Sequence, residues 1–201
     1  MRNKEQTKRK LIDTVRLIFQ KEGYAGLGLN KIARIAGVDK KLIYRYFGNL
    51  DGLIEAYVMD TDYWMRFADG VRELSVPAEV QDLKKLLGAI LKNQFLYFYE
   101  DQEMQQLILW ELSAKSDLMR SIHHTREEMG KSLLELTDPH FKNKAVNFRA
   151  IAALLVGGIY YTILHTRHNG GMFSDVDLST PEGRQEIIKA IDQVLDLTFS
   201  I

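Results

Sequence analysis

Apolar residues recur three and four positions apart along nearly the whole chain, and no sustained alternation of apolar and polar residues predicts a strand. The three prolines, Pro77, Pro139 and Pro181, all fall between these periodic segments. Because proline interrupts a helix but is tolerated between helices, the pattern predicts an all-α fold.

The N-terminal fifty residues contain three predicted helices, over 4–22, 29–36 and 39–47. The first is ended by Gly23 and presents one apolar stripe, made of Leu11, Ile12, Val15, Ile18 and Phe19. The second is expected to stop at Gly37 and to bury Ile32, Ala33 and Ile35. The third is expected to be capped by Asp39, whose carboxylate can accept a backbone N–H, and to bury Ile43 and Phe47.

Longer helices are predicted over 50–75, 79–99, 103–114, 117–136, 143–167 and 181–199. The paired glycines and short polar residues of 168–178 predict a loop. Ser179 and Glu182 have the spacing of a capping box, which predicts the start of the last helix.

Residues 32–47, IARIAGVDKKLIYRYF, have the pattern of a helix-turn-helix. Ala33 and Ala36 are small enough for two helices to approach each other, and Gly37 supplies the backbone freedom for a tight turn. A helix of eight residues is about 12 Å long, comparable with a DNA major groove about 12 Å wide. Its outward residues are Lys40, Lys41, Tyr44 and Arg45, which can contact phosphates and base edges.

The charge distribution favours a polyanionic partner for the N-terminal segment only. Residues 1–50 contain 12 Lys/Arg and 4 Asp/Glu, a net charge of +8, whereas residues 51–201 contain 15 and 23, a net charge of −8. Lys8, Arg9 and Lys10 of the first helix contribute to the positive part. A basic segment joined to an acidic body is typical of a DNA-binding head.

Residues 7–54 resemble the N-terminal DNA-binding domain of TetR/AcrR transcriptional regulators over its whole length. The resemblance rests on FQKEGY at 19–24, on Ile32-Ala33 followed by Ala36-Gly37-Val38, and on Ile43-Tyr44 with Phe47. The residues that it implies for DNA contact are Asn30 and Lys31 in the second helix, Lys40, Lys41, Leu42 and Tyr44 in the groove, and Arg45 and Tyr46 near the phosphates.

Three positions depart from the family pattern. Gly28 stands where the family often has Thr, and Leu50 stands where it usually has Lys, so that two expected phosphate contacts are lacking. Lys41 and Leu42 stand where the family often has a small residue. These departures bear on the operator sequence and the affinity more than on the fold, because the apolar positions are kept.

The resemblance implies a DNA-binding domain at 1–49 and a helical ligand-binding and dimerisation domain at 50–201, joined by the helix at 50–75. The apolar stretch Ala150 to Leu164 has 15 residues, short of the roughly 20 that span a bilayer, and is interpreted as a buried helix or a dimer-forming one. Gly157 and Gly158 within it would permit close helix contact.

The body is rich in aromatic side chains, which would suit a cavity for an apolar or aromatic effector, although ordinary core packing explains any single one equally well. The candidate ligand-binding residues are Tyr63, Trp64, Phe67, Phe98, Met104, Trp110, His123 and Arg126.

These features predict a cytoplasmic, homodimeric regulator that binds a palindromic double-stranded DNA operator as a repressor and is released by a small-molecule effector. No membrane contact, catalytic residue, metal or cofactor is expected. The absence of cysteine excludes thiolate zinc sites and disulfides, and the charged first ten residues do not predict a secretory signal peptide.

Two alternatives stay open. An enzyme could hold a metal with His123, His124, Glu127 and Glu128, which lie at helical spacing, or with His165 and His168. A helical interaction protein of the same fold could have lost specific DNA binding, as the Leu50 departure allows.

Overall fold

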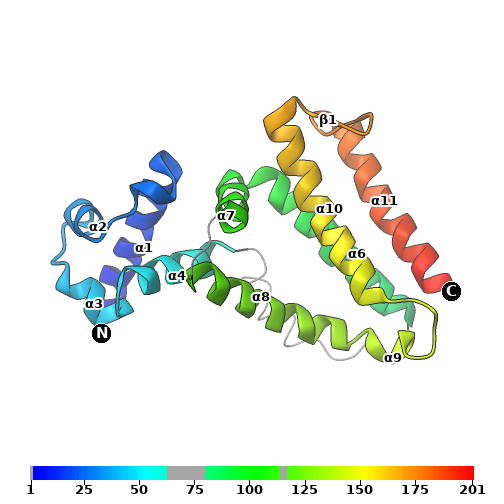
Figure 1. The fold of residues 1–201 in the computed structure, drawn as a ribbon, viewed down its shortest axis with the longest axis horizontal. Helices are drawn as coiled ribbons and strands as arrows, with labels where there is room; N and C mark the ends of the chain where they lie inside the picture. The colour runs from blue at the N-terminus through cyan, green and yellow to red at the C-terminus, as the bar shows by residue number, and fades with distance from the viewer. Residues whose placement is uncertain (1, 63–79, 114–116) are drawn as a thin grey trace. The chain divides into compact units, whose positions relative to one another are not determined.

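The computed structural model describes residues 2–62, 80–113 and 117–201 and has an all-α fold with one short hairpin, so the predicted fold class is confirmed (Figure 1). The chain divides into two compact units. Unit 1 consists of Met1–Ala68 with Glu103–Glu127, and unit 2 of Asp69–Gln102 with Glu128–Ile201. The functional boundary at residues 49 and 50 stays a prediction, because compactness alone does not assign a function to either part.

Unit 1 begins with the three predicted short helices. Its N-terminal elements are α1 (Arg2–Glu22), the 3-10 turn η1 (Tyr24–Gly26), α2 (Leu29–Ala36), α3 (Lys41–Phe47) and α4 (Leu50–Thr61). α1 packs against both α2 and α4, and α3 packs against α4. The side chains buried between them include Leu11, Val15, Ile18, Phe19, Ile32, Ala33, Ala36, Ile43, Leu53 and Ile54.

Three of the residues expected in this core lie nearer its edge. Ile35 is 41% exposed, so the expectation that α2 buries it is wrong, and Ala36 is buried on that helix instead. Ile12 and Phe47 are half-buried. A periodic stripe indicates which face of a helix turns inward, but the width of the buried face depends on how closely the neighbouring helices approach.

The long helix expected over 50–75 ends early, and residues 63–75 of that prediction lie outside the described residues. α4 begins at an Asn49 cap, whose side chain accepts a hydrogen bond from Gly52 N, and ends at Thr61. Asp62 follows with extended backbone (φ −64°, ψ 130°) and is fully buried. Thr61 and Asp62 therefore end the helix well before residue 75, the end expected from the sequence.

Unit 1 also contains α7 (Gln102–Ser113, from Glu103 on) and the first part of α8 (Asp117–Glu135, as far as Glu127). Arg126 on α8 donates hydrogen bonds to the carboxylates of Asp62 and Glu111. The side chains of these three residues are 12%, 0% and 18% exposed. A buried ion triad thus joins the end of α4 to α7 and α8.

Unit 2 is built on α6 (Val80–Glu100), α10 (Phe148–Asn169) and α11 (Pro181–Ser200), with α6 in contact with both of the others (Figure 1). Lys84 and Lys92 of α6 pair with Asp196 and Asp192 of α11. The short helix α9 (Asp138–Phe141) precedes α10, and Phe141 stacks on Phe148 at 5.0 Å.

The segment between α10 and α11 is more ordered than the loop expected from its sequence. Strands β1 (Met172–Phe173) and β2 (Val176–Asp177) form an antiparallel hairpin, and Ser174 and Asp175 make its turn with φ of 51° and 60°. The expected Ser179 cap is wrong. Thr180 is the residue whose hydroxyl accepts the Gly183 N–H, and it caps α11.

α10 is the one helix among the described residues that is long and apolar enough to cross a membrane, and only 28% of its most apolar window is buried. Leu154 is 77% exposed and Tyr161 57% exposed. A Cβ atom added at Gly157 or Gly158 would meet nothing within 4 Å. The interpretation of this segment as a helix buried within one chain is therefore wrong, and the helix has an open apolar face.

Candidate nucleic-acid interface

Gly37 makes the turn between α2 and α3. Its backbone is left-handed (φ 61°, ψ 41°), and its N–H bonds to the carbonyls of Ala33 and Arg34 at the end of α2. The following N–H, from Val38, donates to the Ala33 carbonyl at 3.1 Å. Since a residue with a Cβ is strained in this region, glycine is the residue that closes this helix most readily.

α3 starts two residues later than expected, at Lys41, but Asp39 still has the predicted capping role. Its Oδ1 accepts a hydrogen bond from Lys41 N at 2.8 Å. Ile43 is fully buried and so holds α3 in the core of unit 1, where α3 packs against α4. The sequence therefore sets both the beginning of α3 and the face that it turns inward.

The opposite face of α3 is open. Lys40, Lys41 and Arg45 are exposed, and Tyr44 is 54% exposed. Within the described residues, none of the three cations has an ion-pair partner. Leu42 is half-buried at the edge of this surface. Exposed cations around a protruding aromatic ring can reach phosphates while the ring approaches base edges.

Among the other predicted contact residues, Lys31 and Tyr46 are engaged within the chain, whereas Asn30 is exposed. Asn30 is exposed in the first turn of α2. Lys31 pairs with Glu22 at the end of α1, and Tyr46 is half-buried with the Lys4 ammonium 5.9 Å from its ring centroid. A DNA phosphate would compete with Glu22 for Lys31, so this lysine is expected to contribute less than Lys40 or Lys41.

The basic residues Lys8, Arg9 and Lys10 of α1 also divide into two that have an ion-pair partner and one that, among the described residues, has none. Lys8 pairs with Glu5, and Arg9 pairs with Asp13 and Asp60. Lys10 is exposed, has no ion-pair partner within the described part of the chain, and places its ammonium 3.8 Å from the position of a Cβ added at Gly37. Lys10 thus adds a cation beside the turn of the helix-turn-helix.

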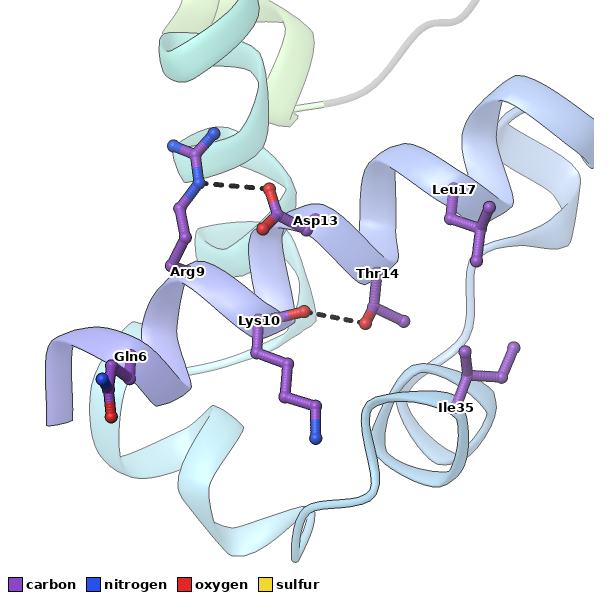
Figure 2. Close-up of a pocket in the computed structure, with 7 residues that line it drawn as sticks. All are labelled: Gln6, Arg9, Lys10, Asp13, Thr14, Leu17 and Ile35. Atoms are coloured by element: carbon purple, nitrogen blue, oxygen red, sulfur yellow. Dashed lines mark hydrogen bonds and ion pairs between the residues drawn. The ribbon is translucent and has the colours of Figure 1, made fainter. Parts of the chain in front are cut away.

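An open depression of about 460 Å³ lies in this region, between α1 and α2. Figure 2 shows the residues that line it. Its lining residues are Gln6, Arg9, Lys10, Asp13, Thr14, Leu17 and Ile35. Arg9 is turned toward Asp13, whereas the Lys10 side chain extends along the depression (Figure 2).

A second ion network holds α1 against α4 and α7. Arg16 donates to Asp60 at 2.8 Å and to Glu103 at 3.1 Å, and the Tyr57 hydroxyl donates to Glu103. Burial opposes the charged forms of both Arg16 and Asp60, but their mutual hydrogen bond and attraction outweigh it. The pKa of Arg16 is consequently raised and the pKa of Asp60 lowered. Sequence reasoning missed this network because its members lie 44 and 87 residues apart.

Four of the predicted effector residues can be placed in unit 1. Met104 and Trp110 of α7 are buried, Arg126 is committed to its two carboxylates, and His123 is exposed. Trp110 stacks on Tyr24 at 4.2 Å and lies 5.9 Å from Phe19. Trp110 therefore packs against the N-terminal helices, and Arg126 serves an ion triad rather than standing open as a polar anchor.

Phe98 lies in unit 2, buried and 4.6 Å from the ring of Tyr160. Tyr63, Trp64 and Phe67 lie outside the described residues. The metal-binding alternative has no geometric support in the described ranges, since they contain no group of three or more His, Asp or Glu residues arranged to hold an ion.

The turn, the open cationic face and the buried supporting helices define a helix-turn-helix protein of the DNA-binding type. Residues 11–57 match the model of the bacterial regulatory proteins of the tetR family. The match covers the helix-turn-helix and supports the resemblance to this family for that segment of the chain.

Two curated relatives are also named as helix-turn-helix regulators. The chain is 25% identical over 133 residues to the probable HTH-type transcriptional regulator YttP of Bacillus subtilis, an alignment covering 66% of this chain and 63% of YttP. It is 29% identical over 110 residues to the HTH-type transcriptional repressor SCO4008 of Streptomyces coelicolor, covering 55% and 52%. The matched region thus spans between half and two thirds of either relative.

A solved structure extends the likeness of fold to nearly the whole chain. The transcriptional regulator FadR of Bacillus subtilis, crystallised with stearoyl-CoA, superimposes with a TM-score of 0.61. The match covers 93% of this chain and 96% of FadR at 18% sequence identity. Unit 2 as well as unit 1 therefore has a helical fold like that of this solved structure.

Proposed function

We propose that the chain is a homodimeric transcriptional repressor that inserts α3 into the major groove at each half of a palindromic operator and is released by a small apolar or aromatic effector. The observation that carries the proposal is the open face of α3, where Lys40, Lys41, Tyr44 and Arg45 stand clear on a helix fixed by buried Ile43. An interaction protein that had lost DNA binding would have no need of these cations.

Selection of bound fragments from the source genome tests DNA binding and requires no defined operator. The wild-type protein is expected to enrich fragments that share a palindromic sequence, and the triple variant Lys40→Ala, Lys41→Ala, Tyr44→Ala is expected to lose the enrichment. Lys142→Ala is the matched control, because Lys142 is exposed in unit 2 and has no ion-pair partner within the described ranges. An unselective pool from the wild-type protein would favour the interaction-protein alternative.

The salt dependence of binding counts the phosphate contacts. With about eight contacts per dimer, affinity is expected to fall by roughly 10³ to 10⁵ between 50 and 200 mM salt. Lys41→Ala removes one contact from each protomer, so the slope of log K against log salt is expected to become shallower by about 2. An unchanged slope would exclude Lys41 from the phosphate contacts.

The open face of α10 supports the homodimer. Its apolar surface is flanked by charged residues, with Arg149 paired to Asp138 at its N-terminal end. The opposite side of α10 packs on α6, so a bilayer would meet only one apolar face of this helix, whereas a second copy could pair with that face at the close distance that Gly157 and Gly158 allow. We therefore assign the face to a second copy of this chain.

Leu154→Glu tests the dimer, with Leu112→Glu as a control at equal exposure, since both leucines are 77% exposed. Light scattering at micromolar concentration is expected to show monomers for Leu154→Glu and dimers for Leu112→Glu and the wild type. Equal behaviour of the two variants would contradict the assignment of α10.

Effector release follows if two states of the dimer differ in operator affinity and the effector binds the weaker-binding state more tightly. SCO4008 is named a repressor, and the structure of FadR contains stearoyl-CoA, which has a long apolar acyl chain; these names support the repressor mode and an effector with an apolar part here. A compound that binds the body tightly yet leaves operator affinity unchanged would contradict release by that compound.

A further inference from the structure

One stripe of α6 is buried along its whole length and contains a single polar residue. Leu83, Leu87, Ile90, Gln94 and Phe98 follow one another at spacings of three and four and therefore share a face of the helix. All five are buried, and Gln94 is 1% exposed. The amide thus lies among apolar side chains in the interior of unit 2.

Among the residues that the structure describes, neither polar atom of the Gln94 side chain has a hydrogen-bond partner. Nε2 and Oε1 are buried and form no hydrogen bond within the described chain. Buried amides are nearly always paired with protein, an ordered water or a ligand, because water hydrogen bonds are lost on burial. Leucine or methionine would fill this position without that loss, so we take the amide as having a partner that the described residues do not supply.

The charges along α6 favour a neutral partner for Gln94. The lysines of α6 are already paired: Lys92 and Lys84 with Asp192 and Asp196 of α11, and Lys85 with Asp82 of α6. No charged residue of α6 shares the buried stripe. An ionised head group beside Gln94 would therefore have no opposite charge on α6 to compensate for its own burial.

We propose that Gln94 binds the polar group of an effector that is otherwise apolar and uncharged. The amide offers a donor and an acceptor side by side, and a primary carboxamide on an aliphatic or aromatic body presents the complementary pair. The inference rests on the proposed function in taking unit 2 as effector-binding, and it adds the anchoring residue and the chemical class of the ligand.

Gln94→Met tests the proposal, because methionine has nearly the same shape without the amide. In the absence of ligand this variant is expected to melt about 2–8 °C above the wild type, since two unpaired polar atoms are removed from the interior. Gln193→Met, at an exposed position of α11, is the control and is expected to leave Tm unchanged.

The ligand arm uses octanamide, N,N-dimethyloctanamide and octanoate at pH 8, with binding followed by calorimetry. Octanamide is expected to bind the wild type and Gln193→Met equally, and to bind Gln94→Met at least tenfold more weakly. The dimethyl compound lacks the donors and octanoate is charged, so both are expected to bind the wild type at least tenfold more weakly than octanamide.

Three results would overturn the proposal: no binding of octanamide by the wild type, equal binding by Gln94→Met, or a lower Tm for Gln94→Met without ligand. The last would show that the amide is already satisfied, for example by a buried water. The fragment selection separates this outcome from failure of the regulator proposal, since Gln94→Met is expected to enrich the same DNA as the wild type. Octanamide binding that depends on Gln94, in a protein without DNA selectivity, would refute only the regulator.

Discussion

Replacement of Arg126 by methionine is expected to destabilise unit 1 strongly. The guanidinium, 12% exposed, lies between Asp62 at 0% and Glu111 at 18%. Methionine keeps most of the bulk but leaves two largely buried carboxylates without their cation. Breaking a buried ion pair from one side costs about 3–5 kcal/mol. For a chain of 201 residues, at about 2–4 °C per kcal/mol, Tm is expected to fall by roughly 6–20 °C.

Circular dichroism at pH 7, with thermal and urea unfolding, measures the effect. Arg120→Met is the matched control on the same helix, because Arg120 is 73% exposed and pairs with Asp117, which is 93% exposed. An exposed pair of this kind contributes less than about 0.5 kcal/mol. Adding Asp62→Asn and Glu111→Gln to Arg126→Met should recover at least half of the loss, since no uncompensated charge remains. Equal losses for Arg126→Met and Arg120→Met would refute the reasoning.

Three further changes probe local features. Gly37→Ala is expected to cost about 1–2 kcal/mol in urea unfolding, because φ is 61° at that turn; no loss would show that the turn tolerates a Cβ. Thr180→Ala should cost about 1 kcal/mol and Ser179→Ala clearly less, because only Thr180 caps α11; the reverse order would restore Ser179 as the cap. Acidification should destabilise the fold in two ranges. The pKa of His140 is lowered by burial and by Lys144, so stability declines as the pH falls below about 6.5, and His140→Phe should flatten urea midpoints between pH 8 and 5. Burial alone would raise the pKa of Asp60, but the hydrogen bond from Arg16 outweighs this effect and the pKa is lowered. Further stability is therefore lost below about pH 3.8. A urea midpoint that stays constant down to pH 3 would contradict this.

The helix-turn-helix could be predicted from sequence because its determinants are local. Gly37, the Asp39 cap and buried Ile43 lie within seven residues of one another, and each acts through its neighbours in the chain. The same holds for the open face of α3, which follows from helical spacing once Ile43 is known to face inward. Whether the exposed residues contact DNA stays a prediction.

The end of α4 could not be predicted, because it depends on a distant partner. No glycine or proline follows Thr61 at once, and the periodic pattern continues beyond it. The first residue after the helix, Asp62, is buried against Arg126, which lies 64 residues later. A helix end of this kind depends on tertiary structure, and a pattern read within one segment contains no information about it.

Gln94 was missed for a different reason. A glutamine within an amphipathic helix is usually assigned to the solvated face, and composition gives no reason to do otherwise. Its spacing from Leu87, Ile90 and Phe98 places it on the buried stripe, so a position-by-position reading of α6 could have found it. The missing hydrogen-bond partner, by contrast, becomes visible only when the neighbours are known.

The attachment of α1 to α7 limits how freely this head can be exchanged between relatives. Arg16 bonds to Glu103, and Tyr24 stacks on Trp110, so two residues of α7 complete the environment of the N-terminal helices. A chimera joined at residue 49 would place Glu103 and Trp110 opposite unrelated side chains. A transplantable head therefore has to include the matching face of α7, so that changes to the N-terminal helices are constrained by a helix that lies outside the helix-turn-helix.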